Sequence, residues 1–344
     1  MSPSSSETVW PSASSSGRLS RTHASAYLKR IKLPQALLDA SPSLDLLRQL
    51  QAAHMLSVPF ESLSVHVPDW HDLEAQISLG GGETVKLGEG AYRRIVELRR
   101  GGWCFTLNSS FASLLRYFGF RVSECAARVF MHQRKDPTEV GWDWESTSHQ
   151  VSIVDWDSSD ERWLVDVGFG SSCAYPIALR SGAVQTSIPS ADLFTIEEHA
   201  RLPGTNPDVL PDSHPYWVVS RRAYSTSGVE YYSPCCAFLL QSVPLKDFET
   251  YNHWQSTSPT ARFFTFFVAT LLREDGERIT LQYMDGMTDD SGNTAAKFTR
   301  TSAPAEGKRE EELEKAWVEM RVKEVRKVLE ERFQMSFPAE YGGN

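Results

Sequence analysis

The sequence has little of several features that would indicate other classes of protein. Its 344 residues include five cysteines, which form no C-x-x-C pair, so neither a zinc ribbon nor a disulfide framework is indicated. No stretch approaches the roughly 18 to 20 apolar residues that a membrane-spanning helix needs. The net charge of -9 argues against general nucleic-acid binding, which requires a basic surface. We therefore expect a globular cytoplasmic protein with no metal site, no membrane or nucleic-acid partner and no obligate protein partner.

The first residues also lack the apolar core of a secretory signal. Residues 1–21 are rich in serine, and we expect them to form a disordered tail of a cytosolic protein. The alternative is an organelle transit peptide, because this segment contains Arg18 and Arg21 and only one acidic residue, Glu7.

Cys104 lies where a glycine-containing turn leads into a predicted helix. Residues 100–108 read RGGWCFTLN, apolar residues continue at helical spacing through Phe118, and Gly119 supplies a stop. The start of a helix carries unpaired N–H groups and a partial positive charge, which favour a thiolate over a thiol. Cys104 is therefore a candidate nucleophile, and the alternative is a buried core cysteine.

Two segments downstream, 148–154 and 163–170, are predicted to pair as a β-hairpin around a polar turn. If the turn is centred just after Asp157, residues whose numbers sum to 315 lie opposite each other. His149 and Asp166 satisfy this sum, so the carboxylate would hold the imidazole in one tautomer. A slip of one residue would put the two on opposite faces. A histidine in a strand is otherwise a core residue.

A thiol, a base and an orienting acid are the groups that nucleophilic catalysis needs. The order Cys, His, Asp, with RGGWC before the helix and DVGFG over residues 166–170, resembles the arylamine N-acetyltransferases. An earlier segment, VPFESLSVH over residues 58–66, is similar to the Pro-Phe-Glu-Asn-Leu segment of that family. The resemblance extends from about residue 22 to Phe337.

Two positions depart from the family pattern. Thr106 stands where the family usually has glutamate, and Ser62 stands where it usually has asparagine. The first change removes a negative charge near the nucleophile, and we expect it to alter local hydrogen bonding or substrate choice. It removes no member of the triad.

The resemblance implies an α+β fold of three domains, related to papain-like cysteine enzymes. These domains are a helical bundle, a β-barrel and an α/β lid. The expected division is a disordered tail over 1–21, a helical bundle with the nucleophile over 22–120, a β-barrel with the histidine and aspartate over 121–222 that includes an insertion loop over 181–214, and a lid with a C-terminal helix over 223–344.

Local patterns predict three further elements. Ser41 is expected to cap a helix that ends before Pro59. Residues 266–283 are expected to form a hairpin around an Asp-Gly turn. The chain is expected to close with a helix that starts near three glutamates, 310–312, and continues along an apolar stripe that ends at Phe333.

The resemblance also implies a ping-pong reaction, with xenobiotic detoxification as the expected role. Cys104 takes the acetyl group from acetyl-CoA, which acts as a co-substrate with no bound cofactor, and an arylamine or arylhydrazine then accepts it. Malonyl-CoA and propionyl-CoA are alternative donors, and Arg128 is the candidate cation for a malonyl carboxylate. A papain-like cysteine hydrolase or amidase and a non-catalytic binding protein are the competing hypotheses.

The remaining candidates would contact the substrates. Each phenylalanine among them is otherwise a core residue, and Arg100 otherwise forms an ion pair with Glu61 or another acid and braces the loop. The candidates are Phe105, Phe130, Phe169 and Gly170 for the aromatic substrate, and Ser148 and Arg100 for CoA.

Overall fold

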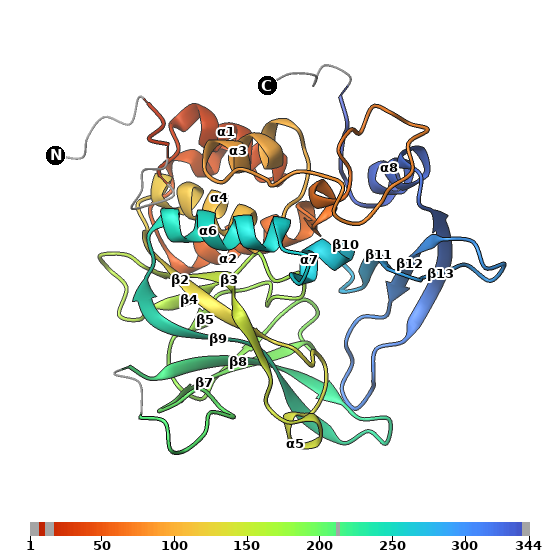
Figure 1. The fold of residues 1–344 in the computed structure, drawn as a ribbon. Coiled ribbons are helices and arrows are strands. Elements are labelled where there is room, and N and C mark those ends of the chain that lie inside the picture. Colours follow the sequence, from red (N-terminus) through yellow and green to blue (C-terminus); the bar gives the residue numbers. More distant parts are fainter. Residues whose placement is uncertain (1–6, 11–16, 211–213, 339–344) are drawn as a thin grey trace.

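The computed structural model describes residues 7–10, 17–210 and 214–338. Helices gather in the N-terminal part, an eight-stranded sheet follows, and a five-stranded sheet with a helix forms the C-terminal part (Figure 1). This α+β arrangement agrees with the expected fold class. Within the described ranges, no helix has the length and apolar character needed to span a membrane.

The N-terminal helices pack around one apolar core, to which α4 contributes Leu107, Phe111, Leu114 and Leu115. Each such side chain stabilises the fold by about 1.5–3 kcal/mol when it is fully buried. The Ser43 hydroxyl accepts a hydrogen bond from the Leu46 N–H and caps α2, so the cap lies two residues after the expected Ser41. The helices are α1 (Arg21–Arg30), α2 (Leu44–Ser57), α3 (Glu89–Tyr92) and α4 (Cys104–Tyr117), with short 3-10 or π segments at Gln35–Asp39, Leu63–Val65 and Arg93–Glu97.

The eight-stranded sheet is antiparallel in the order β5-β4-β3-β2-β9-β8-β7-β6, and its end strands β5 and β6 contact each other. The sheet therefore forms a nearly closed barrel below the helices in Figure 1. Helix α6 (Leu245–Thr257) follows β9 and packs Phe248 against Phe105 at the start of α4. The strands are β2 (Arg121–Phe130), β3 (Trp144–Asp155), β4 (Trp163–Val165), β5 (Ile177–Ala178), β6 (Ala183–Thr186), β7 (Leu193–His199), β8 (Tyr216–Tyr224) and β9 (Glu230–Ser242), and the short helix α5 (Pro137–Val140) lies between β2 and β3.

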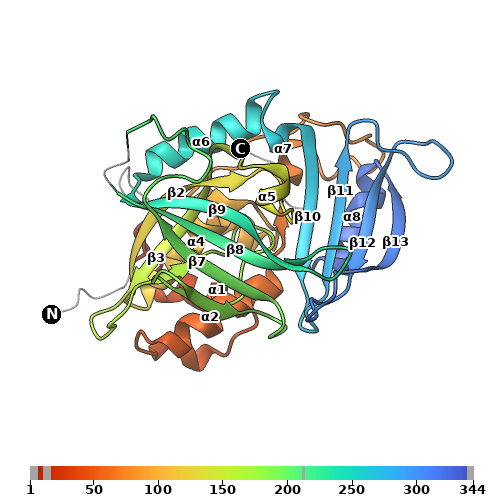
Figure 2. The ribbon, with the colours of Figure 1, turned by 90° about the horizontal axis from the view of Figure 1, so that it is seen from below.

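The second sheet has the order β1-β10-β11-β12-β13, and α8 (Val322–Arg332) packs its apolar side against it, as Figure 2 shows from below. Strand β1 (Phe60–Glu61) comes from the N-terminal part and pairs with β10, so this sheet joins the two ends of the chain. The expected hairpin over 266–283 is confirmed by the pairing of β10 with β11. The other elements are β10 (Phe266–Leu272), β11 (Arg278–Met284), β12 (Ala295–Thr301), β13 (Glu312–Glu319) and the short helix α7 (Arg262–Thr265).

The structure corrects the expected insertion loop and the end of the barrel. Strands β6 and β7 lie inside the segment 181–214, because Phe194 and Ile196 alternate with polar residues and are buried in the barrel. Strand β9 pairs with both β2 and β8. The barrel therefore continues past the expected boundary at 222 to Ser242.

The two ends of the chain also differ from expectation. In the tail, residues 1–6 and 11–16 lie outside the described residues, but Val9 and Arg18 form a β-bridge and the Trp10 ring packs on Tyr92. At the other end, Glu312 starts strand β13 and the helix begins at Val322. The glutamates of β13 pair with basic residues across the sheet, which favours a strand.

Candidate active site

Cys104 is the first residue of α4 and is 2% exposed. The turn before it fits closely against β1, since a Cβ atom on Gly101 would lie 2.2 Å from the Pro59 carbonyl oxygen. The indole N–H of Trp103 donates to the Asn252 side-chain oxygen on α6 at 2.7 Å. The thiol is therefore placed by a helix start, a strand and a second helix.

An ion pair holds this turn in place. The Arg94 guanidinium lies 2.5 Å from the buried Glu61 carboxylate, and its Nε donates to the Gly101 carbonyl oxygen at 2.8 Å. Glu61 also accepts from the Leu63 N–H at 2.7 Å. The Pro-Phe-Glu segment thus fixes the turn through Arg94, and the expected partner Arg100 does not take part in this pair.

His149 and Asp166 are in direct contact, with 2.8 Å between the imidazole Nε2 and the carboxylate Oδ2. The hairpin register differs from the expected one, because Ile153 pairs with Leu164 and the opposed numbers sum to 317. The shift of two residues keeps both side chains on the same face of the sheet. Asp166 lies just beyond β4 and reaches His149 diagonally.

A β-bulge at Ser148 sets the position of the imidazole. Ala127 of β2 pairs with His149, but the next residue, Arg128, pairs with Thr147, so Ser148 is left without a partner across the ladder. Its carbonyl oxygen accepts a hydrogen bond from the Cys104 thiol at 3.4 Å. The bulge brings β3 to the nucleophile, a placement common near active sites.

Asn108, one turn after Cys104, ties α4 to Asp166. Its side-chain N–H groups donate to Asp166 Oδ1 at 3.0 Å and to the Gln150 carbonyl oxygen at 2.6 Å, and its oxygen accepts from the Val167 N–H at 2.9 Å. Asn108 is not among the site residues predicted from the sequence. Its spacing of four residues from Cys104 was the available signal, since residues i and i+4 share a helix face.

Gly168 permits the close approach of this loop to α4. A Cβ atom at this position would lie 2.6 Å from the Cα of Cys104 and 2.7 Å from the Asn108 side-chain nitrogen. Its N–H donates to Asp166 Oδ1 at 2.8 Å. The glycine therefore brings the carboxylate and the thiol to the same imidazole.

The electrostatics favour a charged imidazole. Burial lowers the pKa of His149, but the charge of Asp166, their hydrogen bond and the interaction with the Cys104 side chain outweigh it and raise this pKa to about 10. For Asp166, burial raises the pKa, and His149 and Asn108 more than reverse this, so its pKa lies below the ordinary value. The arrangement places a charged imidazole beside the Cys104 side chain, and nucleophilic catalysis by cysteine uses this pair of groups.

A protein-family model described as N-acetyltransferase matches residues 43–340. The chain belongs to the arylamine N-acetyltransferase family.

Curated relatives of this acyltransferase family include an N-malonyltransferase of Fusarium pseudograminearum, 28% identical over 278 residues, which cover 76% of this chain and 77% of the relative. The arylamine N-acetyltransferase / N-hydroxyarylamine O-acetyltransferase of Salmonella typhimurium is 26% identical over 243 residues, or 70% of each chain.

Solved arylamine N-acetyltransferase structures share the fold. The enzyme from Salmonella typhimurium has a TM-score of 0.66 at 22% identity and covers 94% of this chain and 95% of its own. The enzyme of Mycobacterium marinum in complex with CoA has a TM-score of 0.60 at 23% identity, with 90% and 92% covered.

The candidate substrate residues of this family member lie in different surroundings. Phe169 packs edge-on against the His149 ring, with 5.2 Å between centroids, and is half-buried. Phe105 is buried against Phe248 and Tyr251 of α6. Phe130 is fully buried and packs on aromatic rings at the far end of β2, which favours the core interpretation.

Gly170, Ser148 and Arg128 each form a hydrogen bond with another residue of the protein. Gly170 has a φ of 81° and its carbonyl oxygen accepts from Arg278. The Ser148 hydroxyl donates to the Glu145 carboxylate at 3.0 Å. Arg128 donates to the Glu145 carbonyl oxygen at 3.2 Å.

Arg100 does not form the expected ion pair with Glu61, which pairs with Arg94 instead. Its guanidinium carbon lies 3.4 Å from the centre of the Phe337 ring and 5.1 Å from that of Trp70. Burial lowers its pKa to about 9. This cation–π contact joins the nucleophile's turn to the end of the described chain.

Thr106 is fully buried beside Gly102, and its hydroxyl has no hydrogen-bond partner among the described residues. A glutamate at this position would bury a carboxylate, which is costly without a partner. Across the same residues, no cluster of three His, Cys, Asp or Glu side chains is arranged to hold a metal ion.

Proposed function

We propose that this protein transfers the acyl group of an acyl-CoA to an arylamine or arylhydrazine by a ping-pong reaction through an acyl-Cys104 intermediate. The observation that carries the proposal is the contact of His149 with both the Asp166 carboxylate and the Cys104 side chain. Membership in the arylamine N-acetyltransferase family supports the same chemistry. The Mycobacterium marinum relative in complex with CoA supports CoA as the carrier of the acyl group.

In the first half-reaction, the Cys104 thiolate attacks the thioester carbonyl carbon and the CoA thiolate leaves. Sulfur replaces sulfur, so the carbonyl keeps its oxidation state, and the His149 imidazolium supplies a proton to the departing sulfur. The backbone N–H of Cys104 lies in the first turn of α4, where no carbonyl of the helix can accept from it. It is our candidate donor to the oxyanion.

In the second half-reaction, the amine nitrogen attacks the acyl carbon and neutral His149 takes the proton that the nitrogen loses. Cys104 leaves as a thiolate and the enzyme returns to its starting form. The low exposure of Cys104 and His149, 2% for each, limits the access of water to the thioester. This burial favours transfer over the hydrolysis that a papain-like hydrolase or amidase would carry out.

The donor is proposed to be acetyl-CoA, and a malonyl donor is the second candidate. The observation that favours the second is the similarity to a fungal N-malonyltransferase. Arg128 remains the proposed cation for a malonyl carboxylate. Five free cysteines support a reducing, cytoplasmic site of action, and detoxification of aromatic amines is the proposed role.

Mass spectrometry of the intact protein tests the reaction. Incubation with acetyl-CoA and no amine is expected to add one acetyl group at Cys104, and an arylamine is expected to remove it as the acetylated amine. Cys104→Ala should show neither step and should keep its melting temperature within a few degrees. Cys125→Ala, at a buried cysteine of β2, is the matched control and should acetylate normally.

A binding protein without catalysis would show no adduct with acetyl-, propionyl- or malonyl-CoA. A hydrolase would release the free acid at the same rate with and without the amine. Either result would overturn the proposal.

A further inference from the structure

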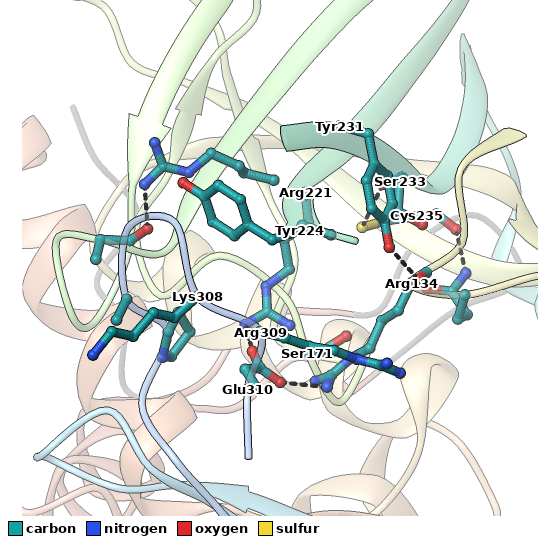
Figure 3. Close-up of a pocket in the computed structure, with 16 residues that line it drawn as sticks. Arg134, Ser171, Arg221, Tyr224, Tyr231, Ser233, Cys235, Lys308, Arg309 and Glu310 are labelled. Carbon is teal, nitrogen blue, oxygen red and sulfur yellow. Dashed lines mark hydrogen bonds and ion pairs between the residues drawn. The ribbon is translucent and has the colours of Figure 1, made fainter. Parts of the chain in front are cut away.

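A pocket opens between the β8–β9 hairpin and the segment that joins β12 to β13. It has a volume of about 170 Å³. Figure 3 shows Tyr224 and Tyr231 on the strand side and Lys308, Arg309 and Glu310 on the other. None of these residues belongs to the triad described above.

Positive charge is concentrated in this pocket, although the whole protein is acidic. Five cationic side chains line it and Glu310 is the one acid among the lining residues. They are Arg134, Arg221, Arg222, Lys308 and Arg309. A strongly basic pocket in a chain of net charge -9 indicates an anionic ligand.

Two of the cations are already neutralised. Arg221 lies 2.7 Å from Asp192 and 2.6 Å from Glu310, and Glu310 also pairs with Arg134. Lys308 and Arg309 are exposed, and within the described residues neither forms an ion pair. Arg222 pairs with Glu230 at the longer distance of 3.7 Å and donates to the Ala191 carbonyl oxygen at 2.7 Å, which leaves its Nε for a ligand.

Buried polar atoms without partners point to the same conclusion. Ser233 is 3% exposed and lines the pocket, and its hydroxyl has no hydrogen-bond partner among the described residues. The Nε of Arg222 is likewise buried and unpartnered there. A buried donor without an acceptor is costly, and a phosphate oxygen would satisfy both groups.

The pocket also offers aromatic surfaces and lies beside the triad. Tyr224 and Tyr231 present rings on which a purine base can stack. Ser171 follows Phe169, which packs on His149, by two residues. Cys235 lines both this pocket and a smaller cavity that Asp166 and Phe169 also line.

We propose that this pocket binds the phosphate groups and the base at the nucleotide end of the acyl donor, with Arg222, Lys308 and Arg309 as the phosphate-binding cations. The proposal rests on the proposed function, since a CoA thioester combines several phosphate charges with an adenine ring. The cluster of Arg134, Arg221, Glu310 and Asp192 has no net charge to spare for the ligand and holds the pocket wall in shape.

Calorimetric titration of the Cys104→Ala protein tests the assignment without turnover. Lys308→Gln/Arg309→Gln is expected to weaken CoA binding on the order of tenfold, because each charged contact to phosphate is lost. The affinity for pantetheine, which lacks the nucleotide, is expected to stay the same. The dependence of CoA binding on salt should also become less steep.

Lys323→Gln/Lys327→Gln is the matched control, because it removes the same charge from exposed positions of α8. This control should bind CoA like the parent protein. Titrations with 3′,5′-adenosine diphosphate and with inorganic phosphate separate a nucleotide site from a site for free phosphate. The nucleotide is expected to bind in the parent and more weakly in the pocket variant.

Equal CoA affinity in the pocket variant and the parent would overturn the proposal. Binding of inorganic phosphate as tightly as the nucleotide would also overturn it. The same holds if the pocket variant binds a carboxylated arylamine more weakly than the parent but binds CoA with the same affinity. Failure of the proposed function would give a different result. In that case Cys104 of the wild-type protein would stay unmodified after incubation with each acyl-CoA.

Discussion

The imidazole of His149 interacts with two side chains, the Asp166 carboxylate and Cys104. Its Nε2 faces the Asp166 carboxylate at 2.8 Å, so the proton at Nε2 is fixed and Nδ1 is left for Cys104. Burial by itself would make this imidazole neutral. The charged form therefore depends on the carboxylate, which makes Asp166 the residue whose change is most informative.

Asp166→Asn is expected to slow acylation of Cys104 by about 10⁴-fold at neutral pH, by analogy with other triads. The imidazolium is present below the pKa of His149 and is lost as the pH rises through it. Without the carboxylate, burial lowers that pKa, so the alkaline decline of the acylation rate should move to lower pH. Stopped-flow rates measured from pH 6 to 10 check both effects.

Asp157→Asn is the control, because Asp157 lies on the same hairpin and is exposed, with Arg121 as its partner. It should leave the rate and the pH profile unchanged. An unshifted alkaline limb in Asp166→Asn would contradict the assignment of Asp166 as the group that keeps His149 charged.

Single residues also show what the sequence could reveal. The contact between His149 and Asp166 follows from period-two alternation, which survives an error of two residues in register. The surroundings of Arg100, by contrast, could not be predicted from the local sequence. Its ring partners Trp70 and Phe337 lie far away in sequence, and Glu61 is taken by Arg94 instead.

At the scale of elements, the site depends on how closely the loop after β4 approaches the start of α4. Gly168→Ala would place a methyl group 2.6 Å from the Cα of Cys104, a backbone atom that cannot rotate away. Helix and loop must separate, at a cost of about 1–3 kcal/mol. We expect a lower melting temperature and at least a tenfold slower reaction of Cys104 with iodoacetamide.

The iodoacetamide rate distinguishes a displaced triad from general destabilisation. If the variant melts earlier but its thiol reacts as fast as in the wild type below the melting temperature, the approach at Gly168 does not position the thiol. A wild-type melting temperature would show that the loop accommodates the methyl group.

The elements themselves were predictable where one local pattern decides them. Helix α4 combines apolar periodicity with a glycine stop, and Gly119 has a φ of 90° after the helix. Strand β13 was missed, because its glutamates suggest a helix start. They form cross-strand ion pairs with Lys297 and Arg300, which depend on the neighbour that the fold supplies.

At the scale of the whole molecule, contacts between distant segments hold the barrel to the C-terminal sheet. Glu310, from the segment before β13, pairs with Arg134 after β2 and with Arg221 on β8. Strand β1 pairs with β10 and connects the nucleophile's turn to the same sheet. Such contacts join residues more than 80 positions apart, and local sequence patterns do not predict them.

Glu310→Gln tests how much the first of these contacts contributes. Burial raises the pKa of Glu310, but the charges of Arg221 and Arg134 outweigh it, so the pKa lies below its ordinary value of 4.5. The carboxylate therefore stabilises the fold above the pKa of the unfolded chain, and this contribution is lost as the pH falls through the lowered folded value. At pH 7 we expect the variant to lose about 2–3 kcal/mol of unfolding free energy.

Urea unfolding of both proteins at several pH values measures this difference, which should narrow as the pH falls below 4.5. Glu312→Gln is the matched control, because its pair with Lys297 is on the surface and should contribute less than about 1 kcal/mol. A difference for Glu310→Gln that is small at pH 7, or that does not change with pH, would mean that the cluster does not hold the barrel to the C-terminal sheet. Stability would then depend on the β1–β10 pairing and the apolar cores, which do not titrate.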